Sequence, residues 1–183
     1  MPELHRVVLD DTPVGPLTLV ASNTGLREVR FGRPSEPAPG VASLAGGDPA
    51  HPVLTPAMDA LRAYFSGDES ALDGVPVDPA RGSPFQRAVW AALRAIPRGE
   101  VTSYGALATE LGQGSARSVG QAVGANPLPV VIPCHRVVTS DGRLGGFSGG
   151  LERKVALLEL EGFHAEGTRF AARLLEDAPT LSL

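Results

Sequence analysis

The 183 residues are enough for one sizeable hydrophobic core or two small ones. No apolar run approaches the roughly 18 residues that a membrane-spanning helix needs, and the N-terminus lacks the apolar core of a signal peptide, so we expect a cytoplasmic protein. One cysteine excludes an internal disulfide and any zinc site with two thiolates, and His5, His51 and His164 follow no metal-binding spacing, so no metal site is expected.

The net charge of −4 is unevenly distributed. Residues 1–80 carry 5 Arg against 11 acids, a balance of −6, and residues 155–183 have a balance of −3. Residues 81–154 carry 8 Arg and one Lys against 4 acids, a balance of +5. A local positive potential rather than the total charge determines whether a polyanion binds, so the middle of the chain is compatible with nucleic acid.

The N-terminal part is predicted to form a scaffold lobe over residues 1–80. Short strands are expected over residues 4–10, 16–22 and 25–31, since turn-forming residues separate them. Residues 32–54 are expected to form a loop and residues 55–66 a helix that ends before Gly67. The stretch 67–82 is the expected linker to the second lobe.

The second lobe begins with a clear helix start. Ser83 is the expected N-cap, Pro84 occupies the first helical position and Gln86 completes a capping box. Ser103 and Ser115 are then expected to cap two short helices separated by a break at Gly112–Gly114, a pattern typical of a helix-turn-helix. Many helical proteins contain such a pair without binding DNA.

The second short helix is almost free of bulky side chains. It contains Ala116, Gly120 and Gly124, and a glycine in a helix costs about 1 kcal/mol relative to alanine, so a close backbone approach is expected there. Arg117 near its N-terminal end is suited to a phosphate or to insertion into a groove. An exposed arginine loosely paired with an acid is the alternative.

The single thiol lies on a proline-rich stretch. Residues 130–132 are expected to form a short buried extended run, and Pro133 ends it and leaves Cys134 on a stiff turn before His135 and Arg136. A basic neighbour favours the thiolate. A lone buried cysteine is more often an inert small hydrophobic residue, so the turn alone does not decide the function.

The last predicted elements are a glycine-rich loop over 145–150 and a helix from about Leu151 to Glu161. The loop is interpreted as a mobile wall over a pocket, because it lacks the lysine and hydroxyl of a nucleotide-binding loop. Glu161 lies at the negative end of the helix and on its inward face, so we expect it to hold one nitrogen of His135 and leave the other to take the proton of the thiol. The alternative is a carboxylate pointing to water.

These motifs resemble the O6-alkylguanine-DNA alkyltransferases, also called methylated-DNA–protein-cysteine methyltransferases. The resemblance rests on Ile132-Pro133-Cys134-His135-Arg136-Val137-Val138, Asn126-Pro127 and Ser148-Gly149-Gly150-Leu151, and weakly on the stretch from Thr12 to Leu17. It implies an α+β fold of two lobes. An N-terminal ribonuclease-H-like sheet lobe covers residues 1–80, and a mostly helical C-terminal domain with a helix-turn-helix covers 81–183, with its core at 82–162.

The resemblance also implies a role for each matching residue. Cys134 would accept the alkyl group, His135 would be its water-linked base and Glu161 the anchor of that histidine. Tyr104 would bind the flipped guanine and Asn126 would join the DNA-reading helix to the active-site turn. Arg117 would enter the duplex from the minor groove. The remaining candidates for contacts with DNA or substrate are Ser115, Ala116, Gly120, Arg136, Val137, Phe147 and Ser148.

The implied activity is an irreversible, single-turnover repair of O6-alkylguanine, with O4-alkylthymine as a second lesion. It requires base flipping, needs no cofactor, and would be carried out by a monomer on double-stranded DNA. Phe147 stands where many relatives have tyrosine, which puts the substrate range in question. Three other readings stay open from the residues alone: a non-catalytic lesion binder, a Cys-His-Glu amide hydrolase and a helix-turn-helix transcription factor.

Overall fold

A computed structural model describes residues 3–36, 39–43, 51–79 and 82–163. The chain divides into two compact units, Met1–Gly82 with Pro127–Val131, and Ser83–Asn126 with Ile132–Leu183. The segment Pro127–Val131 therefore belongs to the N-terminal unit, although it lies in sequence between two parts of the other one. Among the described residues, no helix has the length and apolar character needed to cross a membrane.

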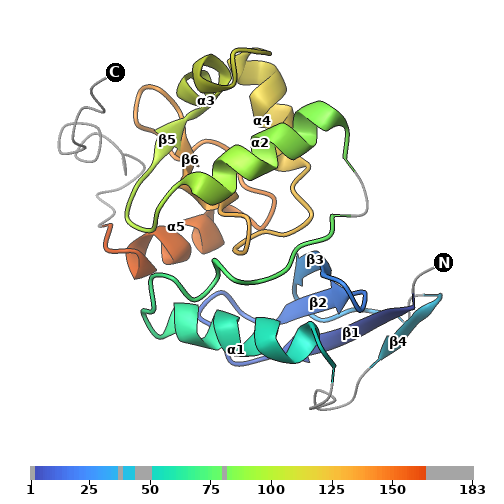
Figure 1. The fold of residues 1–183 in the computed structure, drawn as a ribbon. Coiled ribbons are helices and arrows are strands. Elements are labelled where there is room, and N and C mark those ends of the chain that lie inside the picture. The colour runs from blue at the N-terminus through green and yellow to red at the C-terminus, as the bar shows by residue number, and fades with distance from the viewer. Residues whose placement is uncertain (1–2, 37–38, 44–50, 80–81, 164–183) are drawn as a thin grey trace. The chain divides into compact units, whose positions relative to one another are not determined.

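The N-terminal unit is a sheet with a helix on one face. The strands β1 (Leu4–Leu9), β2 (Leu17–Ala21) and β3 (Leu26–Phe31) form an antiparallel meander, and β4 (Val41–Ser43) pairs with β1 in parallel (Figure 1). The sheet order is β3-β2-β1-β4. The three meander strands confirm the prediction. The fourth strand was missed, because it lies within the stretch 32–54 that was expected to be a loop.

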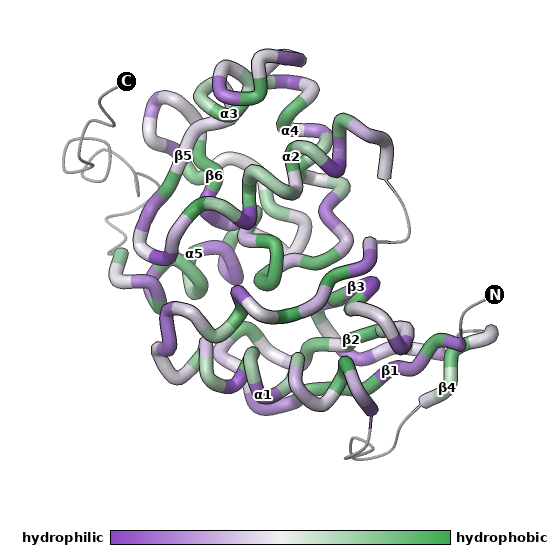
Figure 2. Tube along the Cα trace, viewed as in Figure 1, coloured by the Kyte–Doolittle hydropathy of each residue, from purple (hydrophilic) through white to green (hydrophobic). Residues whose placement is uncertain are grey.

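The core of this unit lies between the sheet and α1 (Leu54–Phe65). Val7 on β1 pairs with Leu19 on β2, and Leu19 pairs with Val29 on β3. All three side chains are buried, as expected for residues that point to the covered face of a sheet. The helix buries Leu61 and Tyr64 together with Leu54, Ala57 and Met58. Figure 2 shows hydrophobic and hydrophilic residues alternating along this helix, as its position on one face of the sheet requires.

The second unit begins with three helices, each of which starts directly after a serine N-cap. The helix α2 (Pro84–Ala95) starts with the predicted capping box, in which Ser83 and Gln86 each accept from the other's backbone N–H. Ser103 and Ser115 cap α3 (Tyr104–Leu111) and α4 (Ala116–Gly124) through the N–H groups of Ala106 and Ser118. The predicted helix-turn-helix pair is therefore present.

The rest of this unit, as far as Phe163, consists of short elements and the helix α5. A 3-10 turn, η1 (Cys134–Arg136), leads into β6 (Val137–Val138), which pairs in parallel with β5 (Thr102–Ser103). The helix α5 (Leu151–Leu160) follows, with Glu161 as its C-cap. The tail beyond Phe163, including His164, lies outside the described residues. The α+β class predicted from the sequence is confirmed.

Candidate active site

The thiol of Cys134 lies at the start of a rigid turn and borders a cavity. The backbone N–H of Cys134 donates to Ile132 and that of Arg136 donates to Pro133, which holds η1 in place. The expectation of an extended run over residues 130–132 is wrong: Val130 has a φ of +74°, and the chain forms a buried turn there. Such a φ is rare for a β-branched residue, so the surrounding packing must impose it.

The cavity that Cys134 borders has a volume of about 400 Å³. Its wall consists mostly of small or apolar side chains, contributed by α3, α4, the end of β6 and the glycine-rich loop. The lining residues are Tyr104, Gly120, Val123, Gly124, Cys134, Thr139, Gly145, Gly146, Phe147 and Ser148. The loop over 145–150 therefore forms a wall of the pocket, as its composition predicted.

Two opposing influences act on the thiol. Burial raises the pKa of Cys134, because a thiolate loses hydration in an apolar environment. The side chain of Asn126, the charge of Lys154 and nearby backbone N–H groups oppose this and lower the pKa. Burial has the largest effect, so the pKa of the thiol is raised overall, and these groups offset only part of that rise.

His135 and Glu161 are paired as predicted. Nε2 of His135 lies 2.9 Å from Oε1 of Glu161, and both side chains are completely buried. Burial lowers the pKa of His135, and the opposing effect of the Glu161 carboxylate is smaller. The net lowering favours the neutral imidazole at pH 7. Nδ1 of His135 is buried and has no hydrogen-bond partner within the described stretches, so this nitrogen remains able to accept a proton.

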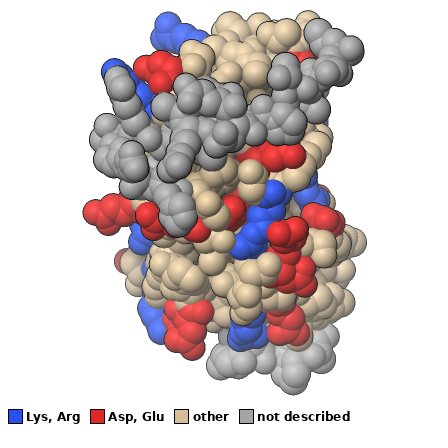
Figure 3. All heavy atoms as spheres, turned by 90° about the vertical axis from the view of Figure 1, so that its left-hand side faces the viewer, with Lys and Arg blue, Asp and Glu red and all other residues tan. Residues whose placement is uncertain are grey.

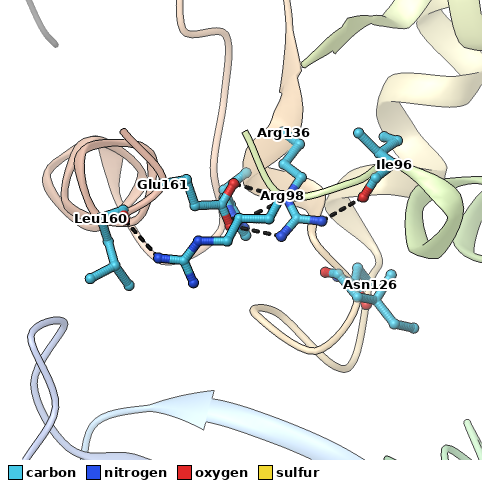
Figure 4. Close-up of polar contacts among 8 residues, drawn as sticks. Ile96, Arg98, Asn126, Arg136, Leu160 and Glu161 are labelled. Carbon is cyan, nitrogen blue, oxygen red and sulfur yellow. Dashed lines mark hydrogen bonds and ion pairs between the residues drawn. The ribbon is translucent and has the colours of Figure 1, made fainter. Parts of the chain in front are cut away.

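Arg136 shares the carboxylate of Glu161. Its Nε and Nη2 donate to the two oxygens of Glu161 at 2.9 and 2.8 Å, and Nη1 donates to the carbonyl of Ile96 at the end of α2 (Figure 4). Burial alone would raise the pKa of Glu161, but the hydrogen bonds from His135 and Arg136 lower it well below its usual range. This geometry argues against the predicted contact of Arg136 with DNA, because the residue is buried and each of its three guanidinium nitrogens donates to Glu161 or Ile96.

Asn126 joins the two ends of the proline-rich stretch by a hydrogen bond. Its Nδ2 donates to the carbonyl of Ile132 at 2.9 Å, and Asn126 directly follows the C-cap of α4 (Figure 4). Between these two residues the chain makes its excursion into the N-terminal unit, where the N–H of Val29 donates to the carbonyl of Pro127. The amide therefore links the end of α4 to the turn that carries Cys134.

Tyr104 lies between the cavity of Cys134 and a second, smaller hollow. It lines both, and the second, of about 300 Å³, includes Ala116 and Gly120 of α4. Burial, with a smaller contribution from Cys134, raises the pKa of the phenol, so Tyr104 carries its proton at neutral pH. The close backbone approach expected at the glycines of α4 is not found: a Cβ at Gly120 would make an ordinary contact with the ring of Tyr104 at 3.7 Å, and one at Gly124 would meet nothing within 4 Å.

The N-terminal turn of α4 carries the exposed candidates. Ser115, Ala116 and Arg117 are all exposed, and the hydroxyl of Ser115 is used in the cap of the helix. Figure 3 shows one face of the molecule on which acidic and basic side chains are interspersed.

The other substrate-binding candidates occupy different positions around the cavity. Phe147 and Ser148 line it, and Ser148 is also exposed. Val137 is fully buried, and its carbonyl accepts a hydrogen bond from Lys154 at 2.6 Å.

Lys154 was missed by the sequence analysis. It is fully buried on α5, and burial lowers its pKa to about 8. Two features of the sequence could have indicated it. Lys154 is the only lysine in the chain, and it lies three and four residues before Leu157 and Leu158, on the inward face of the helix. No group of three or more His, Cys, Asp or Glu suited to a metal ion occurs in the part of the chain that the structure describes.

Comparison with known proteins adds an independent line of evidence. Residues 6–79 match the family model described as the ribonuclease-like domain of 6-O-methylguanine DNA methyltransferase, and residues 84–163 match the model of its DNA binding domain. A methylated-DNA–protein-cysteine methyltransferase of Mycobacterium tuberculosis is 44% identical over 153 residues, which cover 82% of this chain and 88% of that one.

Solved structures agree. The crystal structure of Mycobacterium tuberculosis OGT in complex with DNA matches with a TM-score of 0.74 and 41% identity, covering 86% of this chain and 92% of that one. The O6-methylguanine-DNA methyltransferase of Pyrococcus kodakaraensis matches with a TM-score of 0.62 and 25% identity, covering 87% of this chain and 99% of that one.

Proposed function

The chain belongs to the 6-O-methylguanine DNA methyltransferase family, and from this premise we propose that Cys134 is the residue that accepts the alkyl group. The protein is a methylated-DNA–protein-cysteine methyltransferase that acts in DNA repair. The observation that supports Cys134 most strongly is its place on the wall of a cavity, directly before a buried His135–Glu161 pair. No other cysteine exists in the sequence to take this role.

The proposed reaction begins with the proton of the thiol. Nδ1 of the neutral His135 accepts it, directly or through a water molecule, and Glu161 stabilises the imidazolium through Nε2. The thiolate sulfur then attacks the alkyl carbon on O6 of guanine. The carbon–sulfur bond forms as the carbon–oxygen bond breaks, and the bonding electron pair leaves with the guanine, which takes up a proton.

Negative charge also develops on the guanine as it leaves. Tyr104 lines the same cavity and retains its proton, so its hydroxyl can donate to the guanine as negative charge develops on the ring. The product is a thioether, which contains no disulfide or ester that an ordinary cellular reductant or water would cleave. Each molecule therefore reacts once, and the reaction consumes no cofactor.

The substrate is proposed to be double-stranded DNA, approached from the minor groove. An atom at the edge of a stacked base cannot reach a sulfur inside a cavity, so the damaged nucleotide must be extruded. The exposed N-terminal turn of α4 carries Arg117, which would fill the space that the base leaves. Ala116 and Gly120 allow the helix backbone to approach a narrow groove.

Intact-mass analysis tests the proposal. A duplex oligonucleotide with one O6-methylguanine should add the mass of one CH₂ to each protein molecule, and peptide mapping should locate it on Cys134. The variant Cys134→Ser should bind the oligonucleotide with unchanged affinity and gain no mass. Lesion binding by the native protein without any mass gain would instead indicate a non-catalytic binder, and repeated turnover of an acyl substrate would indicate a hydrolase.

A further inference from the structure

Lys154 makes an unusual set of contacts behind the cavity. Its Nζ donates to the carbonyls of Val137, Leu144 and Gly146, of which the first belongs to β6, the second directly precedes the cavity wall and the third lies in that wall. The side chain is completely buried. One ammonium group therefore joins the strand that follows the Cys134 turn to the loop that encloses the pocket.

The ammonium group of Lys154 is buried, and burial disfavours its charged form. Removing an ammonium group from water costs several kcal/mol, and carbonyl dipoles compensate less completely than a carboxylate would. Within the described residues, no carboxylate forms an ion pair with Lys154. Cys134 is the group that can supply a negative charge: its thiolate raises the pKa of Lys154, and Lys154 lowers the pKa of Cys134.

We propose that Lys154 is a positioning residue of the transfer reaction, which fixes the cavity wall to β6 and supplies the buried positive charge that the Cys134 thiolate requires. This inference rests on the proposed role of Cys134 as the acceptor. The helix α5 would then have two roles: it places Glu161 beside His135, and it places Lys154 behind the cavity.

The identity of the residue agrees with this role. Every other basic residue among the 16 Lys and Arg of the chain is an arginine. A lysine ammonium is a compact charge with three rotatable donors, which can point to three carbonyls in different directions. A guanidinium is a flat fork of five donors and would neither fit the same three acceptors nor concentrate its charge at one point.

The other ionisable groups around the site leave Cys134 and Lys154 as the pair whose charges depend on each other. His135, on the same turn as Cys134, stays neutral because burial lowers its pKa, and Glu161 is held ionised by His135 and Arg136. Tyr104 on α3 has a raised pKa and keeps its proton. Loss of the Lys154 charge should therefore shift the titration of the thiol to higher pH.

The test compares Lys154→Met, which preserves the approximate shape of the side chain and removes its charge, with Arg143→Met as a matched control. Arg143 is an exposed cation that immediately precedes Leu144 and pairs with Asp141. Single-turnover transfer from an O6-methylguanine duplex would be measured across pH, together with DNA affinity and melting temperature.

We expect Lys154→Met to transfer about tenfold more slowly at pH 7, or slower still, with the midpoint of its pH profile about one unit higher or more, since one pKa unit is a tenfold change in thiolate at a given pH. DNA affinity should be unchanged, and Arg143→Met should behave as the native protein. Lys154→Arg should restore the midpoint but only part of the rate. A native rate in Lys154→Met, or a slower rate with an unshifted midpoint, would overturn the inference, whereas an inactive native protein would overturn the proposed function instead.

A measurement on the native protein covers the case in which Lys154→Met does not fold. Because the chain has a single lysine, isotope-labelled lysine gives one side-chain NMR signal, which can be titrated before and after methylation of Cys134. The pKa of Lys154 should fall on methylation, because the thioether cannot become an anion. A pKa that methylation does not change would contradict the inference.

Discussion

His135 and Glu161 form a fully buried pair, with 2.9 Å between Nε2 and Oε1. The histidine lies on the turn that carries Cys134 and the carboxylate is the C-cap of α5, so the pair fixes this turn to α5. The same carboxylate binds the guanidinium of Arg136. One acid therefore orients the proposed base, His135, and neutralises a buried cation, Arg136.

Glu161→Gln should impair both transfer and stability. The amide cannot stabilise an imidazolium as a carboxylate does, so we expect single-turnover transfer to slow by about 10²-fold or more. The variant also leaves Arg136 buried without its counter-charge, which should lower the free energy of unfolding by about 3–5 kcal/mol. Urea unfolding and quenched-flow transfer measure the two effects. Glu159→Gln, an exposed acid on the same helix, is the control and should match the native protein on both counts.

The protein should lose stability in acid. His135 has a lowered pKa in the folded state, as has Glu161, so the unfolded chain binds more protons at low pH than the folded one. The free energy of unfolding should therefore decrease as the pH falls below about 6.5, where an unfolded histidine titrates, and fall further through about 4.3, where an unfolded glutamate does. Denaturation at a series of pH values measures this. A stability that is flat or rises between pH 7 and 4 would contradict the burial of this pair.

Arg117→Ala should weaken action on duplex DNA without affecting the fold. The guanidinium is exposed, so the melting temperature should not change. If Arg117 replaces the extruded base, its loss should reduce transfer from duplex DNA by about tenfold or more, because unstacking a base step costs a few kcal/mol. Transfer from a single-stranded oligonucleotide should be much less affected. Arg87→Ala, an exposed arginine on α2, is the control, and equal losses in the two variants would argue for a general charge effect.

The turn between α3 and α4 should tolerate a side chain at one glycine and not at the other. Gly112 and Gly114 both have positive φ, which costs about 1–2 kcal/mol for an L-residue. A Cβ at Gly112 would contact nothing, but one at Gly114 would lie 2.8 Å from both Phe85 and Ser118. Gly114→Ala should therefore be less stable than Gly112→Ala by roughly 1–3 kcal/mol, which thermal or urea unfolding can measure. Equal stabilities would show that the turn can relax.

The parts of the fold that depend on neighbouring residues were predictable from the sequence. Ser83, Ser103 and Ser115 each begin a helix where predicted, because capping uses a side chain and a backbone N–H only a few residues apart. The strand β4 was not predictable in this way, because its three residues form a strand through pairing with β1 about 37 residues earlier. The turn at Val130 was missed for a related reason, since tertiary packing imposes a φ that valine locally disfavours.

The candidate site divides in the same manner. Cys134, His135 and Glu161 were found because a lone thiol, an adjacent imidazole and an acid at a helix end are each conspicuous in sequence. Arg136 and Lys154 carry charges that the sequence alone would place at the surface, yet both are buried. Their partners are distant carbonyls and a carboxylate that only the folded chain brings together.

The excursion of residues 127–131 into the N-terminal unit limits how the protein can be shortened. Leu128, Val130 and Val131 are all buried, and the segment groups with strands that precede it by about a hundred residues. A fragment beginning at Ser83 would retain these three side chains and lose the strands they group with, at roughly 1.5–3 kcal/mol for each side chain returned to water. We therefore expect such a shortened protein to aggregate on expression. The portion before Ser83 is needed to cover the apolar side chains of residues 127–131 and cannot be removed without cost.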